Sequence, residues 1–397
     1  MGNATVTRWS RAFVAVGIGF FLGWQVAVAA GLPRVATVPL GVSGFVLHVA
    51  FGKAYTLVPS YFARELAVSR APALHLPFAT VGAVGAAAAG AGIGPPIVAL
   101  LGAGSWFAGC LVFVAAIGWT VRDNPTGRET GTGATDAHRE RVDRLANAAV
   151  PVVLAYLLVG SSLPLAVEFG RELPAIAPGP ATTHLLAAGT AALLVFAVGF
   201  RLLPRLLVVS VRPTLVGVVL AAGIAGPALL AVDFRGGPLF RLGGALEAIA
   251  LVGFAVAAID LYRRSDRRRV GGRAILAAAC CAALIAVLGL LFAFAPAASV
   301  PAAAYDAHYR LAVGGFVGLT IVGVSYRFYP PAVASRRGIG DRTARLSVAA
   351  LVAGLAVEVA GLLVSAPQAV TIGRWLSVLG AALYAAVCWT IFLERAR

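Results

Sequence analysis

The chain has 397 residues, of which 60% are hydrophobic and only 12% are charged, and its formal net charge is +16 at pH 7. A water-soluble domain of this length has too little interior to bury so much apolar surface. A basic excess would suggest a nucleic-acid partner in a soluble protein, but the cytoplasmic loops of membrane proteins carry the same excess. The composition therefore excludes a soluble globular protein, argues against nucleic acid and indicates the lipid bilayer as the partner.

Runs of about 20 apolar residues recur along almost the whole chain, and this is the length that a helix needs to cross a bilayer. Because the runs are continuous rather than alternating, they predict an all-α polytopic membrane protein and not a β-barrel. The first run exceeds the apolar part of a signal peptide, so we expect it to be retained as the first helix. Twelve spans are predicted, at about 12–31, 37–62, 72–93, 95–121, 146–167, 181–204, 208–232, 237–261, 274–298, 307–331, 343–365 and 372–393.

The distribution of arginine predicts the orientation of these spans. Lys53 is the only lysine, so 31 of the 32 Lys and Arg side chains are arginines. With the N-terminus placed inside, 25 arginines fall in the inner segments and 6 in the outer segments. This asymmetry follows the positive-inside rule and predicts that both termini are cytoplasmic. The preference for Arg over Lys is typical of GC-rich genomes, and we expect a multi-pass protein of a prokaryotic cell membrane.

A spaced pattern of glycine, aromatic residue and proline recurs three times. The aromatic residue follows the glycine by eleven positions and the proline follows four positions later, in the second, sixth and tenth predicted spans. Repeats of this kind indicate a repeated structural unit. We therefore predict three pseudo-symmetric four-helix groups, at about 8–121, 146–261 and 274–393, within one membrane domain. The three copies are Gly44, Tyr55 and Pro59; Gly189, Phe200 and Pro204; and Gly315, Tyr326 and Pro330.

Twelve spans in three quartets with cytoplasmic ends resemble subunit I of the heme–copper oxidases and the related NnrS-type membrane proteins. In that family the second helix carries a heme-ligating histidine eleven residues before a proline, which is the spacing of His48 and Pro59. The tenth span, "HYRLAVGGFVGLTIVGVSYRFYPP", matches the family pattern with His308 in the first histidine position, Gly323 in the middle and Pro330 at the end. The resemblance implies heme binding with a redox or nitric-oxide-related role.

The sequence also departs from the family at its metal-binding positions. Arg310 occupies the position of the second histidine of the tenth helix, and the seventh span contains no histidine. The sixth span offers only His184, at its outer end. Because copper needs several imidazoles that converge on one point, we expect no copper site. The protein is therefore not predicted to be a terminal oxidase.

The candidate ligands of a heme iron are His48, His308 and His184, all on spans that carry the repeat. The resemblance implies that His48 and His308 clamp one porphyrin from two helices. The alternative is that each histidine is hydrogen-bonded within the bundle or at the interface. Arg310 and Arg241 would pair with heme propionates, because arginine binds carboxylates in a bidentate manner.

Three further charged residues, Lys53, Glu247 and Glu358, lie well inside their spans. Charges within a membrane usually face an interior pocket or a partner of opposite charge. A Lys–Glu pair across the bundle is the simplest prediction for them. His75, near the cytoplasmic side, is interpreted as structural.

Two other classes of function remain open. The chain would be a twelve-helix carrier of a small solute or ion, with Lys53, Glu247 and Glu358 along its path, although carriers usually show two repeats rather than three. It would otherwise be a cofactor-free scaffold of the same fold. No nucleotide-binding loop, catalytic triad or zinc motif is found, so the sequence leaves open whether the chain is an enzyme. A redox role would require a membrane-bound or soluble redox partner.

Overall fold

The computed structural model describes residues 2–171, 176, 178–234, 236–267 and 270–395. Four arginines counted for the orientation, Arg235, Arg268, Arg269 and Arg397, lie outside these residues. In chain order the elements are α1 (Gly2–Ala29), α2 (Arg34–Pro39), η1 (Leu40–Leu47), α3 (His48–Tyr61), α4 (Ala71–Gly90), α5 (Ile97–Val121), η2 (Ala134–Arg139), α6 (Glu140–Glu168), α7 (Pro178–His184), η3 (Leu185–Ala192), α8 (Leu193–Leu207), α9 (Pro213–Val232), α10 (Pro238–Arg264), α11 (Val270–Phe294), η4 (Ala297–Ser299), α12 (Ala302–Arg310), η5 (Leu311–Gly318), α13 (Leu319–Phe328), η6 (Pro331–Val333), α14 (Asp341–Leu363) and α15 (Pro367–Glu394).

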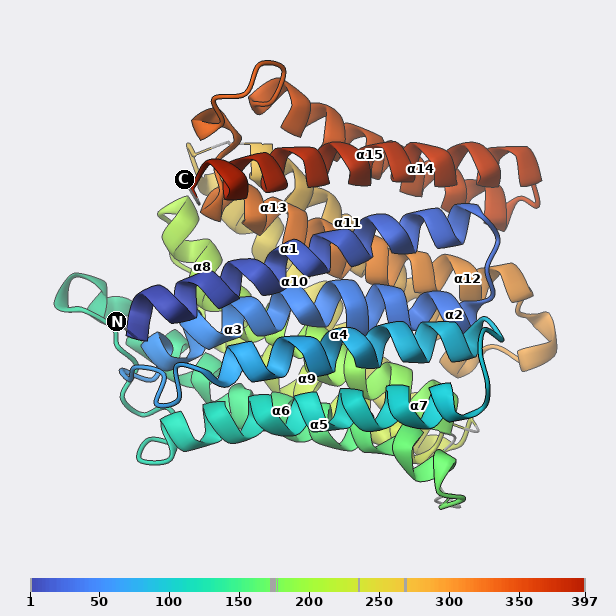
Figure 1. Cartoon of the computed structure of the whole chain (residues 1–397), viewed down its shortest axis with the longest axis horizontal. Helices are drawn as coiled ribbons and strands as arrows, with labels where there is room; N and C mark the ends of the chain where they lie inside the picture. Colours follow the sequence, from blue (N-terminus) through green and yellow to red (C-terminus); the bar gives the residue numbers. More distant parts are fainter. Residues whose placement is uncertain (1, 172–175, 177, 235, 268–269, 396–397) are drawn as a thin grey trace.

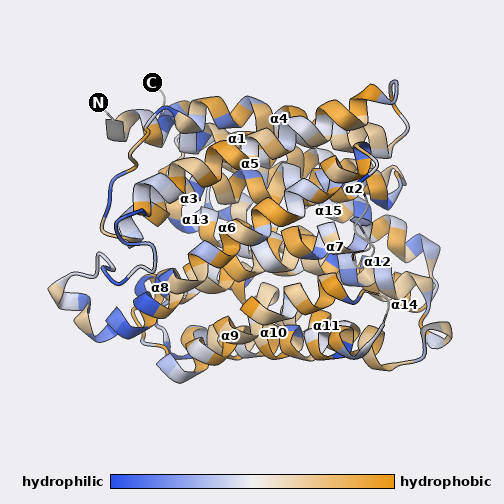
Figure 2. Cartoon of the chain, turned by 90° about the horizontal axis from the view of Figure 1, so that it is seen from below, coloured by the Kyte–Doolittle hydropathy of each residue, from blue (hydrophilic) through white to orange (hydrophobic). Residues whose placement is uncertain are grey.

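Within the described residues, twelve continuous helical stretches are long and apolar enough to cross a membrane. Each coincides with one of the predicted spans, including the short break between α4 and α5. Both termini lie at the same end of the bundle, as an even number of spans requires (Figure 1). Hydrophilic residues gather at the two ends of the bundle, and hydrophobic residues cover its length (Figure 2). The all-α polytopic membrane fold is therefore confirmed.

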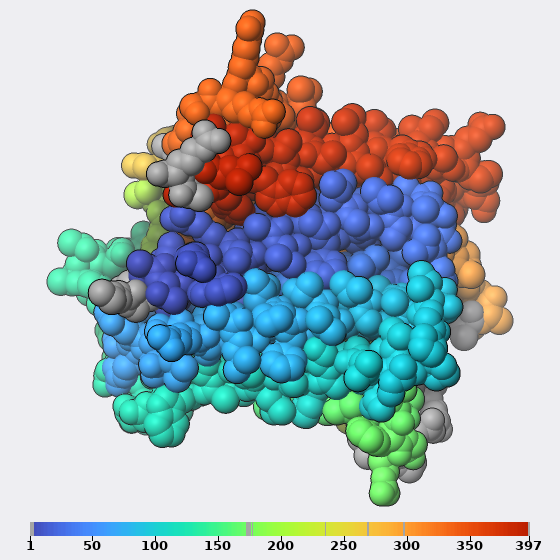
Figure 3. All heavy atoms as spheres, viewed as in Figure 1, coloured from blue at the N-terminus to red at the C-terminus, as the bar shows by residue number. Residues whose placement is uncertain are grey.

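Three of the twelve spans form the centre of the bundle. They are the second (α2–η1–α3), the sixth (α7–η3–α8) and the tenth (α12–η5–α13), and they contact one another through η1, η3 and η5. Between 61% and 72% of their apolar windows is buried, against 28–56% in the other spans. The remaining spans contact one another in turn around this centre, and the ring closes where α1 packs between α15 and α4 (Figure 3).

Each central span contains an eight-residue π-helical segment at the same place in the repeat. Gly44, Gly189 and Gly315 are the fifth residues of η1, η3 and η5. A π segment adds one residue to a turn and is common at functional sites. The three π segments therefore occupy the same register of the glycine–aromatic–proline pattern. The extra residue changes the direction of the side chains that follow each segment relative to those that precede it.

The repeat glycines are required by close helix packing. A Cβ atom on Gly44 would lie 2.5 Å from Phe20 of α1, and one on Gly189 would lie 2.7 Å from Tyr156 of α6. One on Gly315 would lie 2.7 Å from Cys281 of α11. In each group the central span therefore packs its glycine against the first span of that group, and a side chain there would force the two helices apart.

Candidate functional site

His48 is completely buried at the start of α3, and both of its ring nitrogens are occupied. Its Nδ1 lies 2.8 Å from the Ser43 carbonyl oxygen in η1, and its Nε2 lies 3.2 Å from the Thr80 hydroxyl of α4. Because a carbonyl oxygen only accepts, Nδ1 carries the proton and Nε2 accepts from Thr80. The ring also lies between Phe13 and Phe20 of α1. His48 is thus held as a hydrogen-bonded core histidine, with no free nitrogen to bind a metal.

His308 lies on α12, with its ring at 62° to that of Phe292 of α11 and the two centroids 5.3 Å apart. Its Nδ1 is buried and has no hydrogen-bond partner. The structure therefore does not bring His48 and His308 together as the predicted clamp requires, because His48 faces α1 and α4 and His308 faces α11.

His184, the last residue of α7, has the arrangement typical of a metal-ligating imidazole. Its Nδ1 donates to the Pro180 carbonyl oxygen at 3.0 Å, which leaves the Nε2 lone pair free. A hydrogen bond donated by one ring nitrogen fixes the tautomer of a histidine and raises the basicity of its other ring nitrogen. The ring packs against Phe234, with centroids 4.8 Å apart. His184 therefore keeps one ring nitrogen free of hydrogen bonds, on a central span that neighbours the span of His308.

An aromatic cluster fills the core where α8, α10 and η5 meet. Phe254 of α10 packs against Phe196 of α8 and Phe316 of η5, with ring centroids 5.2 Å and 5.9 Å away.

Glu247 lies on α10 seven residues before Phe254, which is two turns or about 10 Å along the same helix face. Its Oε1 is buried and has no hydrogen-bond partner. Glu247 is thus a buried carboxyl group without a compensating charge among the described residues.

The prediction that Lys53 pairs with Glu247 or Glu358 is wrong. The Lys53 ammonium donates to the Tyr329 hydroxyl at 2.7 Å and lies over the rings of Phe328 and Tyr329, 4.3 Å and 4.4 Å from their centroids. Within the described residues it forms no ion pair. An aromatic face attracts a cation through its quadrupole, so two rings and a hydroxyl replace the expected carboxylate.

Glu358 pairs instead with two arginines at the end of the bundle opposite the termini. Its Oε2 accepts from Arg310 Nε at 2.9 Å, and its Oε1 accepts from Arg374 Nε at 3.0 Å. Arg310 also donates through Nη2 to Gln25 at 2.8 Å, and its guanidinium lies 4.5 Å from the centroid of a Trp24 ring. Arg310 therefore neutralises a buried acid, and its Nε and Nη2 are not free for a heme propionate. Arg241, the other propionate candidate, is exposed at the start of α10.

A second buried network, near the termini, was not predicted. Asp143 is fully buried at the start of α6, and the Arg205 Nη2 donates to it at 2.6 Å. Arg201 Nε lies 3.3 Å from the same carboxyl group, and its Nη groups donate to Asn147 and to the carbonyl oxygens of Tyr61 and Thr130. The sequence signal was the arginine that follows the repeat aromatic in "GFRLLP", but its partners come from two other spans and a loop.

His75 belongs to the same buried group as His48, which the sequence did not indicate. It is fully buried, its Nδ1 lies 3.1 Å from the Tyr55 hydroxyl, and Phe13 packs against both histidines. Its Nε2 has no partner. Tyr55 is the aromatic residue of the first repeat, so this position has a polar role in addition to packing.

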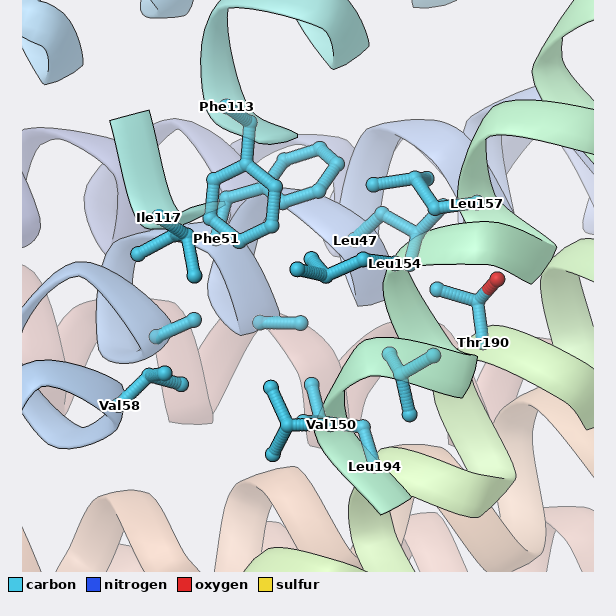
Figure 4. A pocket seen from close by; sticks show the side chains of 13 residues that line it. Leu47, Phe51, Val58, Phe113, Ile117, Val150, Leu154, Leu157, Thr190 and Leu194 are labelled. Carbon is cyan, nitrogen blue, oxygen red and sulfur yellow. The ribbon is translucent and has the colours of Figure 1, made fainter. Parts of the chain in front are cut away.

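An enclosed cavity of about 20 Å³ lies among α3, α5, α6 and the sixth span (Figure 4). Its lining is apolar apart from Thr190, and includes Leu47, Phe51, Phe113 and Leu157. A volume of this size holds about one or two water-sized molecules. It does not fit a porphyrin, for which ligand pockets of several hundred Å³ are usual.

Of the three predicted heme ligands, His184 and His308 keep a ring nitrogen without a hydrogen-bond partner. Within the described part of the chain, no group of three or more His, Cys, Asp or Glu side chains gathers to hold a metal ion. A heme supplies four nitrogens to its iron and needs only one or two axial ligands, so two imidazoles form a chemically complete set. His48 does not fit, because both nitrogens are used. Compared with known proteins, the sequence matches no protein-family model and no curated protein.

Proposed function

We propose that the chain is a heme-binding integral membrane protein with a redox or nitric-oxide-related role, and that His184 and His308 are its axial ligands. The observation that carries the proposal is that both imidazoles keep a ring nitrogen without a hydrogen-bond partner, at the same end of neighbouring central spans. The Pro180 carbonyl oxygen holds the His184 Nδ1 proton, so Nε2 is the nitrogen that would ligate. The resemblance of the tenth span to that of the heme–copper oxidases, with His308 in a ligand position, supports the same assignment.

A bound heme would supply one-electron redox chemistry. The chain would contribute two imidazoles, together with the aromatic rings of Phe234, Phe292 and Tyr305 that surround them. The aromatic cluster of Phe196, Phe254 and Phe316 would separate this site from the half of the bundle nearer the termini. We place both termini in the cytoplasm of a prokaryotic cell on the arginine distribution. The site would then lie toward the outer side of the membrane.

The test is the absorption spectrum of protein produced with ample heme. The wild type should show a Soret band, and His184→Ala and His308→Ala should each shift or remove it. The control is His48→Gln, which keeps a hydrogen-bonding side chain in the core and should leave the band unchanged. A wild type without a Soret band contradicts the proposal, and so does a band that depends on His48 but not on His184 or His308.

The second candidate is a carrier of a small solute or ion, which Glu247 favours. A buried carboxyl group without a partner, inside a membrane span, is expected to take part in the movement of a proton or an ion. Flux into vesicles that contain the purified protein should then depend on Glu247 and be lost in Glu247→Gln. A scaffold without a cofactor would show neither a Soret band nor flux, and the close packing around the cavity of about 20 Å³ favours this third reading.

A further inference from the structure

The Arg310 cluster, which we define as Gln25, Arg310, Glu358 and Arg374, has hydrogen-bond donors that its own residues do not fill. Both arginines bind Glu358 through Nε, so Glu358 does not fill all of their donors. Arg310 Nη2 donates to Gln25, but Arg310 Nη1 is buried and has no partner. The Arg310 side chain is only 3% exposed, so bulk water cannot solvate this donor freely. A buried unsatisfied donor on a charged group is unusual and destabilising.

The cluster also has an excess of positive charge. It contains two guanidinium groups and one carboxylate, and Glu358 is fully buried. A further ion pair at this end, Arg34 with Asp306, is balanced and lies at the surface. A buried positive charge without a counter-ion is costly in a membrane span, so a bound monoanion would lower the free energy of the folded state.

The backbone is built to hold these groups together. A Cβ atom on Gly373 would lie 2.4 Å from the Glu358 amide nitrogen and 2.6 Å from the Gly354 carbonyl oxygen. α14 and α15 can therefore approach closely only because residue 373 is glycine, and this approach places Arg374 beside Glu358. Trp24 lies beneath the Arg310 guanidinium and donates through its indole N–H to Tyr309 at 2.6 Å. Stacking of this kind fixes the plane of the guanidinium and hence the direction of its free N–H groups.

We propose that the Arg310 cluster is a binding site for a small, planar, monovalent oxyanion, of the carboxylate or nitrate type, which enters from the membrane face opposite the termini. The planar fork of a guanidinium matches such oxyanions with two parallel hydrogen bonds. Arg374, whose side chain is 27% exposed, provides the entrance, and the buried Nη1 of Arg310 is the inner donor. One monovalent anion fills the free donors and balances the charge. The site does not depend on the proposed heme.

Formate is the probe for the first experiment, because it is the smallest carboxylate. Purified protein in detergent is titrated with sodium formate, with sodium chloride at equal ionic strength as the reference. Formate should raise the thermal unfolding temperature in a saturable manner beyond the chloride effect. In Arg374→Gln the affinity should fall on the order of tenfold or more, since a charged hydrogen-bond donor is lost. The matched control is Arg241→Gln, which removes an exposed arginine at the same end and should leave formate binding unchanged.

A second variant keeps the proposal testable if Arg374→Gln does not fold. Arg374→Lys retains the charge beside Glu358 but lacks the planar fork, so it should fold and bind formate more weakly than the wild type. Equal formate binding by the wild type and Arg374→Lys, or a wild-type response no larger than that to chloride, overturns the proposal.

The source of the oxyanion is identified by repeating the titration after heme loading. A free small anion should bind with the same affinity with and without heme. Formate binding that disappears only in the heme-loaded protein would show that a heme carboxylate occupies the same donors, which still supports a carboxylate site. Loss of the Soret band with retained formate binding would contradict the proposed function and leave this site intact.

Discussion

Two buried clusters at opposite ends of the bundle have the same core, a fully buried carboxylate bound by two arginines. In the Arg201 cluster, near the termini, Asp143 is bound by Arg201 and Arg205. Both Nη groups of Arg201 donate to protein oxygens, and its Nε, which makes no hydrogen bond, lies 3.3 Å from Asp143. Asp136 lies 3.5 Å from Arg205 and 3.0 Å from Arg139, so this cluster also holds one more arginine than carboxylates. At the opposite end, among the described residues, Glu358 has no second carboxylate beside it, and the Nη1 of Arg310 has no acceptor.

This difference separates a structural lock from a site. The Arg201 cluster ties the loop between α5 and α6 to the ends of three spans, because its donors bind carbonyl oxygens of Tyr61 and Thr130 and the side chain of Asn147. Removing any member leaves others unpaired. In the Arg310 cluster the missing acceptor would be supplied from outside. Buried charge and an unfilled Nε occur without implying a site, and what distinguishes the Arg310 cluster is an Nη group, at the tip of the guanidinium, without an acceptor among the described residues.

The largest effect is expected from Asp143→Ala. The substitution leaves Arg201 buried with a positive charge and no carboxylate, and loss of one partner of a buried ion pair destabilises a protein by about 3–5 kcal/mol. The yield of monodisperse protein and its thermal unfolding temperature should both fall sharply. An unfolding temperature close to that of the wild type would show that the Arg201 cluster is not a structural lock.

Glu358→Gln should have a smaller effect, of about 2 kcal/mol, because Arg374 is partly open to solvent and the single amide oxygen of the glutamine still accepts a hydrogen bond from one arginine. Added formate should restore part of the lost stability by replacing the carboxylate. Asp143→Asn provides the contrast, and formate should not restore its stability. Equal rescue of both variants, or of neither, would remove the distinction between the two clusters.

Gly373→Ala tests the backbone of the Arg310 cluster. The new methyl group would meet the Glu358 backbone at 2.4 Å, so α14 and α15 must separate, which costs about 1–3 kcal/mol. Formate affinity should fall as well, although no charged group is changed. The matched control is Gly217→Ala in α9, where a Cβ meets nothing within 4 Å and neither stability nor formate affinity should fall.

The smallest effect is expected from Lys53→Met, at about 1 kcal/mol. The substitution removes one hydrogen bond to Tyr329 and the contact of the ammonium with two ring faces, but it leaves no buried counter-charge behind. The thermal unfolding temperatures of Lys53→Met and Tyr329→Phe, compared with that of the wild type, measure this loss of stability. A loss as large as that of Asp143→Ala would indicate an acidic partner that the structure does not show.

All twelve spans could be predicted from the sequence, since each depends only on a local run of apolar residues. The repeat glycines could also be located, because the same spacing recurs at Gly44, Gly189 and Gly315 and each supports a close helix contact. The π segments could not be anticipated, because nothing in their composition distinguishes them from α-helix. His48 follows its π segment, four residues after Gly44, whereas His308 precedes its π segment, seven residues before Gly315, so the two histidines lie at different depths of the bundle.

The pairing of charges was predicted least well, because it depends on which helix faces meet. Glu247 or Glu358 was expected to pair with Lys53, but the partners of Glu358 are on α12 and on the adjacent α15. Lys53 was expected to need an acid, but aromatic rings and a hydroxyl surround it. His184 was the weakest ligand candidate at the sequence level, because its position at the end of a span suggested an interface residue rather than a ligand.

The electron paramagnetic resonance spectrum of the oxidised, heme-loaded protein tests the central claim most directly. Two axial imidazoles give a low-spin ferric iron, so we predict a low-spin signal in the wild type. Replacement of either histidine, in His184→Ala or His308→Ala, should convert this signal to high spin, while His48→Gln should retain it. A wild type that binds no heme, or a low-spin signal that persists in both alanine variants, would contradict the assignment of His184 and His308.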